Sequence, residues 1–304
     1  MSAPGTPYTP LAGASSRRYA LLHSLLFLLM RAVLEKIKTL FKMENSAPVF
    51  EAFSDLTPSP QFPTSDGAAP IAAISYTPDF AKAMGYFRSV IKKEEVSQRA
   101  YLLTTEVLAL NPGNYTVWHW RRRCMDELGL SVEKELEWLD EVGIENEKCY
   151  QYWHHRRLVV EKLGKPYAGE EDFFDEILES DSKNYHAWTY RQWYLAHYGL
   201  IAGQLDEASK LIESNILNNS FWTFRYFVVA HMHEESKEPA ALIEKEVQYA
   251  LSQIEKKSTN EAAWAYLRGF LKTQKNENPS LDKSQVLYSE VPEVGCIDCR
   301  WRRE

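Results

Sequence analysis

Residues 184–193 read Asn-Tyr-His-Ala-Trp-Thr-Tyr-Arg-Gln-Trp, and altered copies of this stretch recur along most of the chain. Aligned on their first tryptophan, the copies lie at intervals of 35, 35, 34 and 42 residues and are centred on Trp118, Trp153, Trp188, Trp222 and Trp264. Periods of this length are typical of helical-hairpin repeats, because one period holds two helices and two short turns. Neither helix can bury its apolar face alone, so successive pairs must stack. The sequence therefore predicts an all-α fold, a right-handed α-α superhelix (solenoid) of helical hairpins.

Each copy has an asparagine four residues before the tryptophan and an arginine three residues after it, except that Cys149 and Leu267 replace them in the second and fifth copies. Because an asparagine at a helix start accepts backbone N–H bonds, the cysteine is expected to cost about 1 kcal/mol. For the arginine two interpretations stay open, a buried ion pair with a neighbouring helix or a contact with an anion. We favour the ion pair, because a function rarely repeats at every period. We expect the tryptophans in the core.

The composition is that of a globular chain, with 304 residues, 45% hydrophobic and 25% charged residues. A net charge of −7 and a pI near 5.7 argue against a general nucleic-acid binder, whose binding face is basic. Four unevenly spaced cysteines are too few for a disulfide framework, so a reducing compartment and a cytoplasmic location are favoured.

The chain divides into four parts. Residues 1–42 contain about twelve largely apolar residues, too few for a membrane span of about twenty. They are either a signal anchor or organellar presequence, or an extension upstream of a natural start at Met43, which we favour. Residues 43–78 are predicted as a proline-rich extended arm. Residues 79–272 are predicted as the helical-repeat solenoid with five tryptophan repeats, and residues 273–304 as an irregular tail.

The pair Cys296 and Cys299 invites a metal or a redox interpretation. A structural zinc ion needs four ligands, and no second Cys or His pair is spaced to complete the set. A thioredoxin-like site needs a strand and helix context that the sequence lacks. Neither interpretation is favoured.

The repeats resemble those of the prenyltransferase α-subunit family, and their order resembles the α subunit shared by protein farnesyltransferase and type I geranylgeranyltransferase. Over about residues 70–272, the copies that carry the resemblance read Asn114-Tyr-Thr-Val-Trp-His-Trp-Arg-Arg, Tyr150-Gln-Tyr-Trp-His-His-Arg-Arg, Lys183-Asn-Tyr-His-Ala-Trp-Thr-Tyr-Arg-Gln-Trp and Asn218-Asn-Ser-Phe-Trp-Thr-Phe-Arg-Tyr. The resemblance implies a crescent of hairpins around a β subunit. That heterodimer transfers a farnesyl or geranylgeranyl group from its diphosphate to the cysteine of a C-terminal Cys-a-a-X (CaaX) sequence. It also implies no cofactor in this chain, with zinc and magnesium bound with the β subunit.

The same resemblance assigns site residues to the starts of the repeat helices. It implies catalytic roles for Lys148, which contacts the diphosphate, and Tyr150. It implies substrate binding by Gln151, which meets the peptide carboxylate, and by Tyr115, Asn184, Tyr185 and His186. A lysine beside a helix N-terminus adds a full charge to a positive dipole end, which suits a departing diphosphate. Without the resemblance, Lys148 reads as a solvated surface cation and the tyrosines as structural.

Three functions remain open. The first is the α subunit of a heterodimeric protein prenyltransferase, inactive without its β subunit. The second is a truncated, non-catalytic helical-repeat adaptor. The third, the α subunit of a Rab-type prenyltransferase, is expected to carry extra domains that are missing here. A shortened form with weaker β-subunit binding is a further expectation, since the family continues with more hairpins. The choice between farnesyl and geranylgeranyl lies in the other chain.

Overall fold

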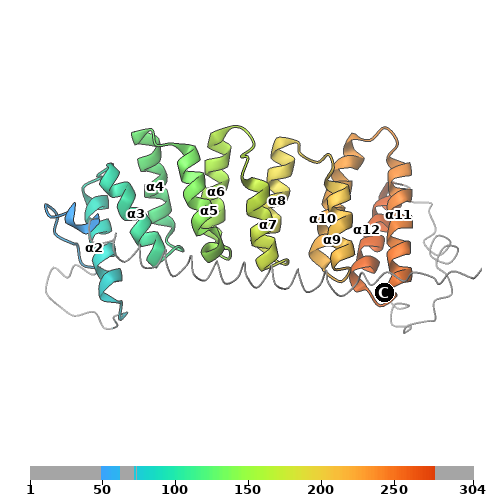
Figure 1. Ribbon diagram of the computed structural model, residues 1–304, viewed down its shortest axis with the longest axis horizontal. Coiled ribbons are helices and arrows are strands. Elements are labelled where there is room, and N and C mark those ends of the chain that lie inside the picture. The colour runs from blue at the N-terminus through green and yellow to red at the C-terminus, as the bar shows by residue number, and fades with distance from the viewer. Residues whose placement is uncertain (1–48, 62–71, 73, 278–304) are drawn as a thin grey trace, which may run out of the picture. The chain divides into compact units, whose positions relative to one another are not determined.

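The computed structural model describes residues 49–61, 72 and 74–277, and every regular element in these ranges is a helix (Figure 1). The predicted all-α fold class is confirmed. The chain forms two compact units, residues 1–130 and 131–304, which are described one at a time. The predicted N-terminal extension, residues 1–42, lies outside the described residues.

Among its described residues, the first unit contains three long helices, α2 (Pro78–Lys92), α3 (Gln98–Leu110) and α4 (Tyr115–Leu128). Thr77 caps α2 by accepting a 3.3 Å bond from the Phe80 N–H. α3 packs against both of its neighbours, α2 and α4.

The predicted extended arm is extended only in part. Residues 49–51 are helical, 52–55 form a turn, and 56–60 have no regular structure. The helical turn is held by apolar contacts, because Phe53 is fully buried and its ring packs on Tyr86. Residues 56–60 lie beside α2, where the Ser59 N–H donates to Ser89 Oγ at 3.0 Å. The part of the arm that contains Phe53 and Ser59 is therefore packed on α2.

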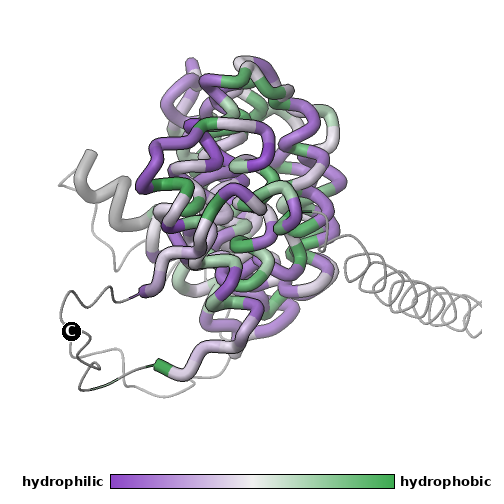
Figure 2. The backbone as a smooth tube through the Cα atoms, turned by 90° about the vertical axis from the view of Figure 1, so that its left-hand side faces the viewer, coloured by the Kyte–Doolittle hydropathy of each residue, from purple (hydrophilic) through white to green (hydrophobic). Residues whose placement is uncertain are grey.

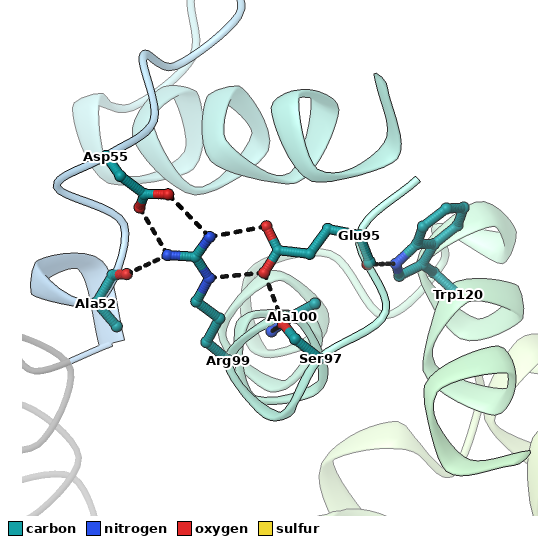
Figure 3. Close-up of polar contacts among 7 residues, drawn as sticks. All are labelled: Ala52, Asp55, Glu95, Ser97, Arg99, Ala100 and Trp120. Carbon is teal, nitrogen blue, oxygen red and sulfur yellow. Dashed lines mark hydrogen bonds and ion pairs between the residues drawn. The ribbon is translucent and has the colours of Figure 1, made fainter. Parts of the chain in front are cut away.

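Arg99, on α3, forms hydrogen bonds with Ala52 and Asp55 of this arm (Figure 3). Its guanidinium donates to both Asp55 oxygens at 2.6 and 3.1 Å, to the Ala52 carbonyl at 2.6 Å, and to both Glu95 oxygens at 2.6 and 2.9 Å. These bonds from Arg99 lower the pKa of Asp55 and the pKa of Glu95.

The second unit is a series of helical hairpins, each formed by two successive helices (Figure 1). Its elements are α5 (Val132–Gly143), the short 3-10 helix η1 (Ile144–Asn146), α6 (Tyr150–Leu163), α7 (Glu170–Ser180), α8 (Tyr185–Tyr198), α9 (Gln204–Ser214), α10 (Asn219–Glu235), α11 (Pro239–Lys256) and α12 (Glu261–Glu277). Hydrophobic and hydrophilic residues are interspersed along the described backbone, as amphipathic helices require (Figure 2). α12 continues to Glu277, so helical structure extends past the predicted boundary at residue 272.

The repeated tryptophan is tied to its own turn. In all five copies the indole N–H donates to the carbonyl six residues earlier, at 2.7–3.0 Å. The expectation of core tryptophans is confirmed for the first four copies, which are at most 6% exposed, whereas Trp264 is half-buried.

The repeated asparagine joins one hairpin to the next. Its Oδ1 accepts from the first N–H groups of its own helix, as at Asn184, Asn218 and Asn260. Its Nδ2 donates to a backbone carbonyl in the corresponding turn of the preceding repeat. For Asn184 this is the Glu147 carbonyl at 3.2 Å, and for Asn260 it is the Ile216 carbonyl at 2.8 Å. The same two carbonyls accept the indoles of the preceding repeat. One side chain therefore caps a helix and fixes the spacing between repeats.

The predicted buried ion pair is confirmed at two of the repeated arginines. Arg156 donates from two nitrogens to Glu170 at 2.9 and 3.0 Å, and all of these groups are fully buried. Arg225 makes the same two-bond contact with Glu246 at 2.7 and 2.9 Å. Although burial lowers the pKa of Arg225, its bonds to Glu246 outweigh this effect and raise it.

Arg191 lacks such a partner. Its nearest carboxylate is Glu171 at 3.7 Å, and its Nε is buried without a hydrogen bond. Burial lowers the pKa of Arg191. Gln204 opens α9 as Glu170 opens α7, and its Oε1 is likewise buried without a partner. An amide stands where the preceding repeat has a carboxylate.

Candidate functional site

The first turns of α6 and α8 bring together three of the predicted site residues. Tyr150 and Tyr185 are the first residues of these two neighbouring helices. The His186 ring meets Tyr150 edge-on, with centroids 4.2 Å apart, and Tyr185 with centroids 5.6 Å apart. Partial burial lowers the pKa of His186, so its imidazole is neutral at pH 7. These rings form a continuous aromatic surface across two repeats.

The tyrosines of this surface do not belong to the core. Tyr150 and Tyr185 are each 67% exposed. The equivalent position after the cap holds Asn219 in the fourth copy and Glu261 in the fifth, and both are exposed. The repeat geometry therefore does not need an aromatic ring here, and the structural interpretation of these tyrosines loses its support.

Tyr115 occupies the same position in the first unit. It is the first residue of α4, directly after the cap Asn114, and it is 76% exposed. Its predicted role in substrate binding stays a prediction.

Lys148 lies beside the start of α6, in the turn before the cap position. Its side chain is 72% exposed, and its Nζ is 3.6 Å from Glu147 Oε1 and 3.7 Å from Asp181 Oδ2. Neither carboxylate was predicted from the sequence. No local pattern points to Asp181, because it belongs to the turn of the next repeat.

Cys149 gives α6 no side-chain cap, as expected from the loss of asparagine. Its thiol donates instead to Gln151 Oε1 at 3.4 Å. With its oxygen engaged in this way, Gln151 has its amide nitrogen as a donor, the group that its predicted contact with a carboxylate requires.

Asn184 has a role that the sequence did not reveal. It is 3% exposed, and both ends of its amide are engaged, Oδ1 by the Ala187 N–H at 3.1 Å and Nδ2 by the Glu147 carbonyl at 3.2 Å. It thereby connects the turn that carries Lys148 to the start of α8. A substrate contact by Asn184 stays a prediction, whereas its positioning role is visible.

Within the described ranges, no group of three or more His, Cys, Asp and Glu residues is arranged to hold a metal ion. Cys296 and Cys299 lie outside these ranges. The absence of a metal from this chain therefore stays a prediction. In the same ranges, no helix combines the length and apolar character that crossing a membrane requires.

Comparison with a known family agrees with the repeat pattern. The family described as "Protein prenyltransferase alpha subunit repeat" matches residues 97–128, 132–163 and 167–198. Each match covers one helical hairpin, α3 with α4, α5 with α6, and α7 with α8. The three predicted tyrosines all lie in these matched repeats.

The curated relatives that match carry the name protein farnesyltransferase/geranylgeranyltransferase type-1 subunit alpha. The relative from Solanum lycopersicum is 44% identical over 96 residues, which are 32% of this chain and 27% of that protein. The relative from Schizosaccharomyces pombe is 39% identical over 99 residues, 33% of each protein. The matched stretch thus spans about a third or less of the length of these relatives.

A solved structure matches over a longer stretch. Candida albicans protein geranylgeranyltransferase-I complexed with GGPP superimposes with a TM-score of 0.67 and 28% identity, over 77% of this chain and 78% of that one. The predicted hairpin superhelix and the resemblance seen in the sequence are confirmed by these matches. Residues 97–128, 132–163 and 167–198 therefore each match a protein prenyltransferase α-subunit repeat.

Proposed function

We propose that this chain is the α subunit of a heterodimeric protein prenyltransferase. The complex transfers a farnesyl or geranylgeranyl group from its diphosphate to the cysteine of a C-terminal CaaX sequence. The names of the curated relatives and the GGPP complex of the structural neighbour support this proposal. Without a β subunit the chain is inactive, and a cytoplasmic location belongs to the same proposal.

The observation that carries the proposal is the exposed group at the starts of α6 and α8. Lys148, Tyr150 and Tyr185 are 67–72% exposed, and none of them belongs to the buried core. A cation beside a helix N-terminus attracts negative charge, which develops on a departing diphosphate. The Gln151 amide donates to the peptide carboxylate, and the aromatic rings form the edge of the substrate pocket.

The remaining chemistry belongs to the partner. Zinc, magnesium and most of the isoprenoid pocket are assigned to the β subunit, so no step of the proposal passes through a metal in this chain. To this division of labour the described residues of this chain contribute a cation, an amide and aromatic rings.

Co-expression of the full chain with a farnesyltransferase β subunit tests the proposal. We expect the two chains to copurify and to farnesylate a CaaX peptide, while neither chain does so alone. A complex without transfer activity contradicts the proposal and favours the non-catalytic adaptor. Failure to form a complex with either a farnesyl or a geranylgeranyl β subunit contradicts it as well.

A further inference from the structure

The Lys148 ammonium lies between carboxylates of two different repeats. Glu147, in the turn before α6, has Oε1 at 3.6 Å from Nζ, and Asp181, in the turn before α8, has Oδ2 at 3.7 Å. An anion that binds Lys148 has to compete with both of these oxygens. The carboxylates also repel the anion directly, because charges this close to the surface still act over several ångströms.

Asp181 is held in place by its own turn. Its Oδ1 accepts from the Lys183 N–H at 3.1 Å, and its backbone N–H donates to the Ile177 carbonyl at 2.9 Å. Since Oδ1 is engaged, Oδ2 is the oxygen that meets Lys148. An asparagine at this position would keep the Oδ1 bond and the turn, and would lose only the charge.

Glu147 is a poorer probe of the same effect. Its backbone carbonyl holds the Trp153 indole and the Asn184 amide, and its Oε2 is buried without a hydrogen bond. A change of this side chain would alter the packing of the turn as well as the charge. Asp181, with a side chain 34% exposed, separates the two effects.

We propose that Asp181 is a positioning residue that acts through Lys148 and weakens the binding of diphosphate at this site. The inference rests on the proposed function and deepens it. Asp181 holds the ammonium group when the site is empty and repels the diphosphate when it arrives. It therefore favours release of the diphosphate product. Removal of one charge about 4 Å from the ammonium, in a solvent-exposed setting, corresponds to a change of about fivefold in affinity.

The test is a titration of inorganic diphosphate into the complex of the full chain with a farnesyltransferase β subunit. We expect Asp181→Asn to bind about three- to tenfold more tightly than the wild type, with a smaller difference in about 0.5 M salt. Asp181→Glu, which restores the charge, should return the affinity to within about twofold of the wild type. The matched control is Glu179→Gln, an equal charge change at an exposed position of α7. Unchanged or weaker binding by Asp181→Asn overturns the inference, and so does an equal gain in the control.

The two proposals fail separately. Farnesyl transfer by the wild-type complex is measured on the same preparation. If that complex is active and Asp181→Asn does not tighten binding, only the inference fails. If the wild-type complex is inactive or does not form, the proposed function fails. The titration is then made on the chain alone, where absence of binding, or equal binding by both variants, overturns the inference.

Discussion

The substitution Gln204→Glu should stabilise the protein by completing an ion pair in the third repeat. In the second repeat, Arg156 and Glu170 form a buried pair with two bonds of 2.9 and 3.0 Å. In the third repeat, Arg191 Nε and Gln204 Oε1 are both buried without partners. A buried polar group left without a hydrogen bond costs about 1–3 kcal/mol. We expect a glutamate at 204 to reach Arg191 as Glu170 reaches Arg156, and therefore to raise the free energy of unfolding by about 2 kcal/mol.

Chemical denaturation and calorimetry measure this gain. For a chain of this size, about 2 kcal/mol corresponds to a rise in Tm of about 3 °C. The reciprocal control is Glu170→Gln, which places an amide in the second repeat and should cost about 3–5 kcal/mol by leaving Arg156 buried with one partner removed. If Gln204→Glu leaves the stability unchanged or lowers it while Glu170→Gln destabilises, the equivalence of the two positions is refuted.

Three further predictions concern the cap, the surface and the arm. Cys149→Asn should raise the free energy of unfolding by about 1 kcal/mol by supplying the missing cap of α6, and no change in a denaturation curve would contradict this. Tyr150→Ala should change stability by less than about 0.5 kcal/mol, because the side chain is exposed, but should lower the rate of transfer by the heterodimer; a large loss of stability would show that the ring is structural. The packing of residues 49–61 on the helices should weaken at low pH. Asp55 and Glu95 have lowered pKa values through their bonds to Arg99, so their contribution is complete above their ordinary pKa values near about 4 and is lost as the pH falls through the lower folded values. Hydrogen exchange of residues 49–61 at pH 3 and pH 6, corrected for the intrinsic rate, should show loss of protection at pH 3, and equal protection would contradict the role of Arg99.

The repeat architecture was predictable because its signal is local and recurs. The tryptophan bonds to a carbonyl six residues earlier, and the asparagine caps the helix that it precedes. In each copy, the residues that form the turn and begin the helix therefore lie within about ten positions of one another. The boundary at residue 272 was too early, because the last turns of α12, residues 273–277, are polar and lack the apolar spacing that marks a buried helix face.

The candidate site was only partly predictable. The resemblance located Lys148 and Tyr150, but the ion pair with Asp181 joins two repeats, and no spacing within one repeat encodes it. The contact of Tyr150 with His186 also joins two repeats, so no spacing within one repeat encodes it. The unsatisfied Arg191 was also missed, since its environment depends on the start of the following helix, where Gln204 replaces a carboxylate.

The role of Lys148 in transfer tests the central claim most directly. The measurement is the rate of farnesyl transfer to a CaaX peptide by complexes that contain the wild type, Lys148→Ala or the control Lys210→Ala. Lys210 is matched to Lys148, because its side chain is 73% exposed and pairs with a carboxylate at 3.5 Å. Loss of a group that stabilises developing charge lowers such rates by about 100-fold or more, so we expect this loss for Lys148→Ala and a rate close to that of the wild type for Lys210→Ala. Equal rates for all three complexes would contradict the account.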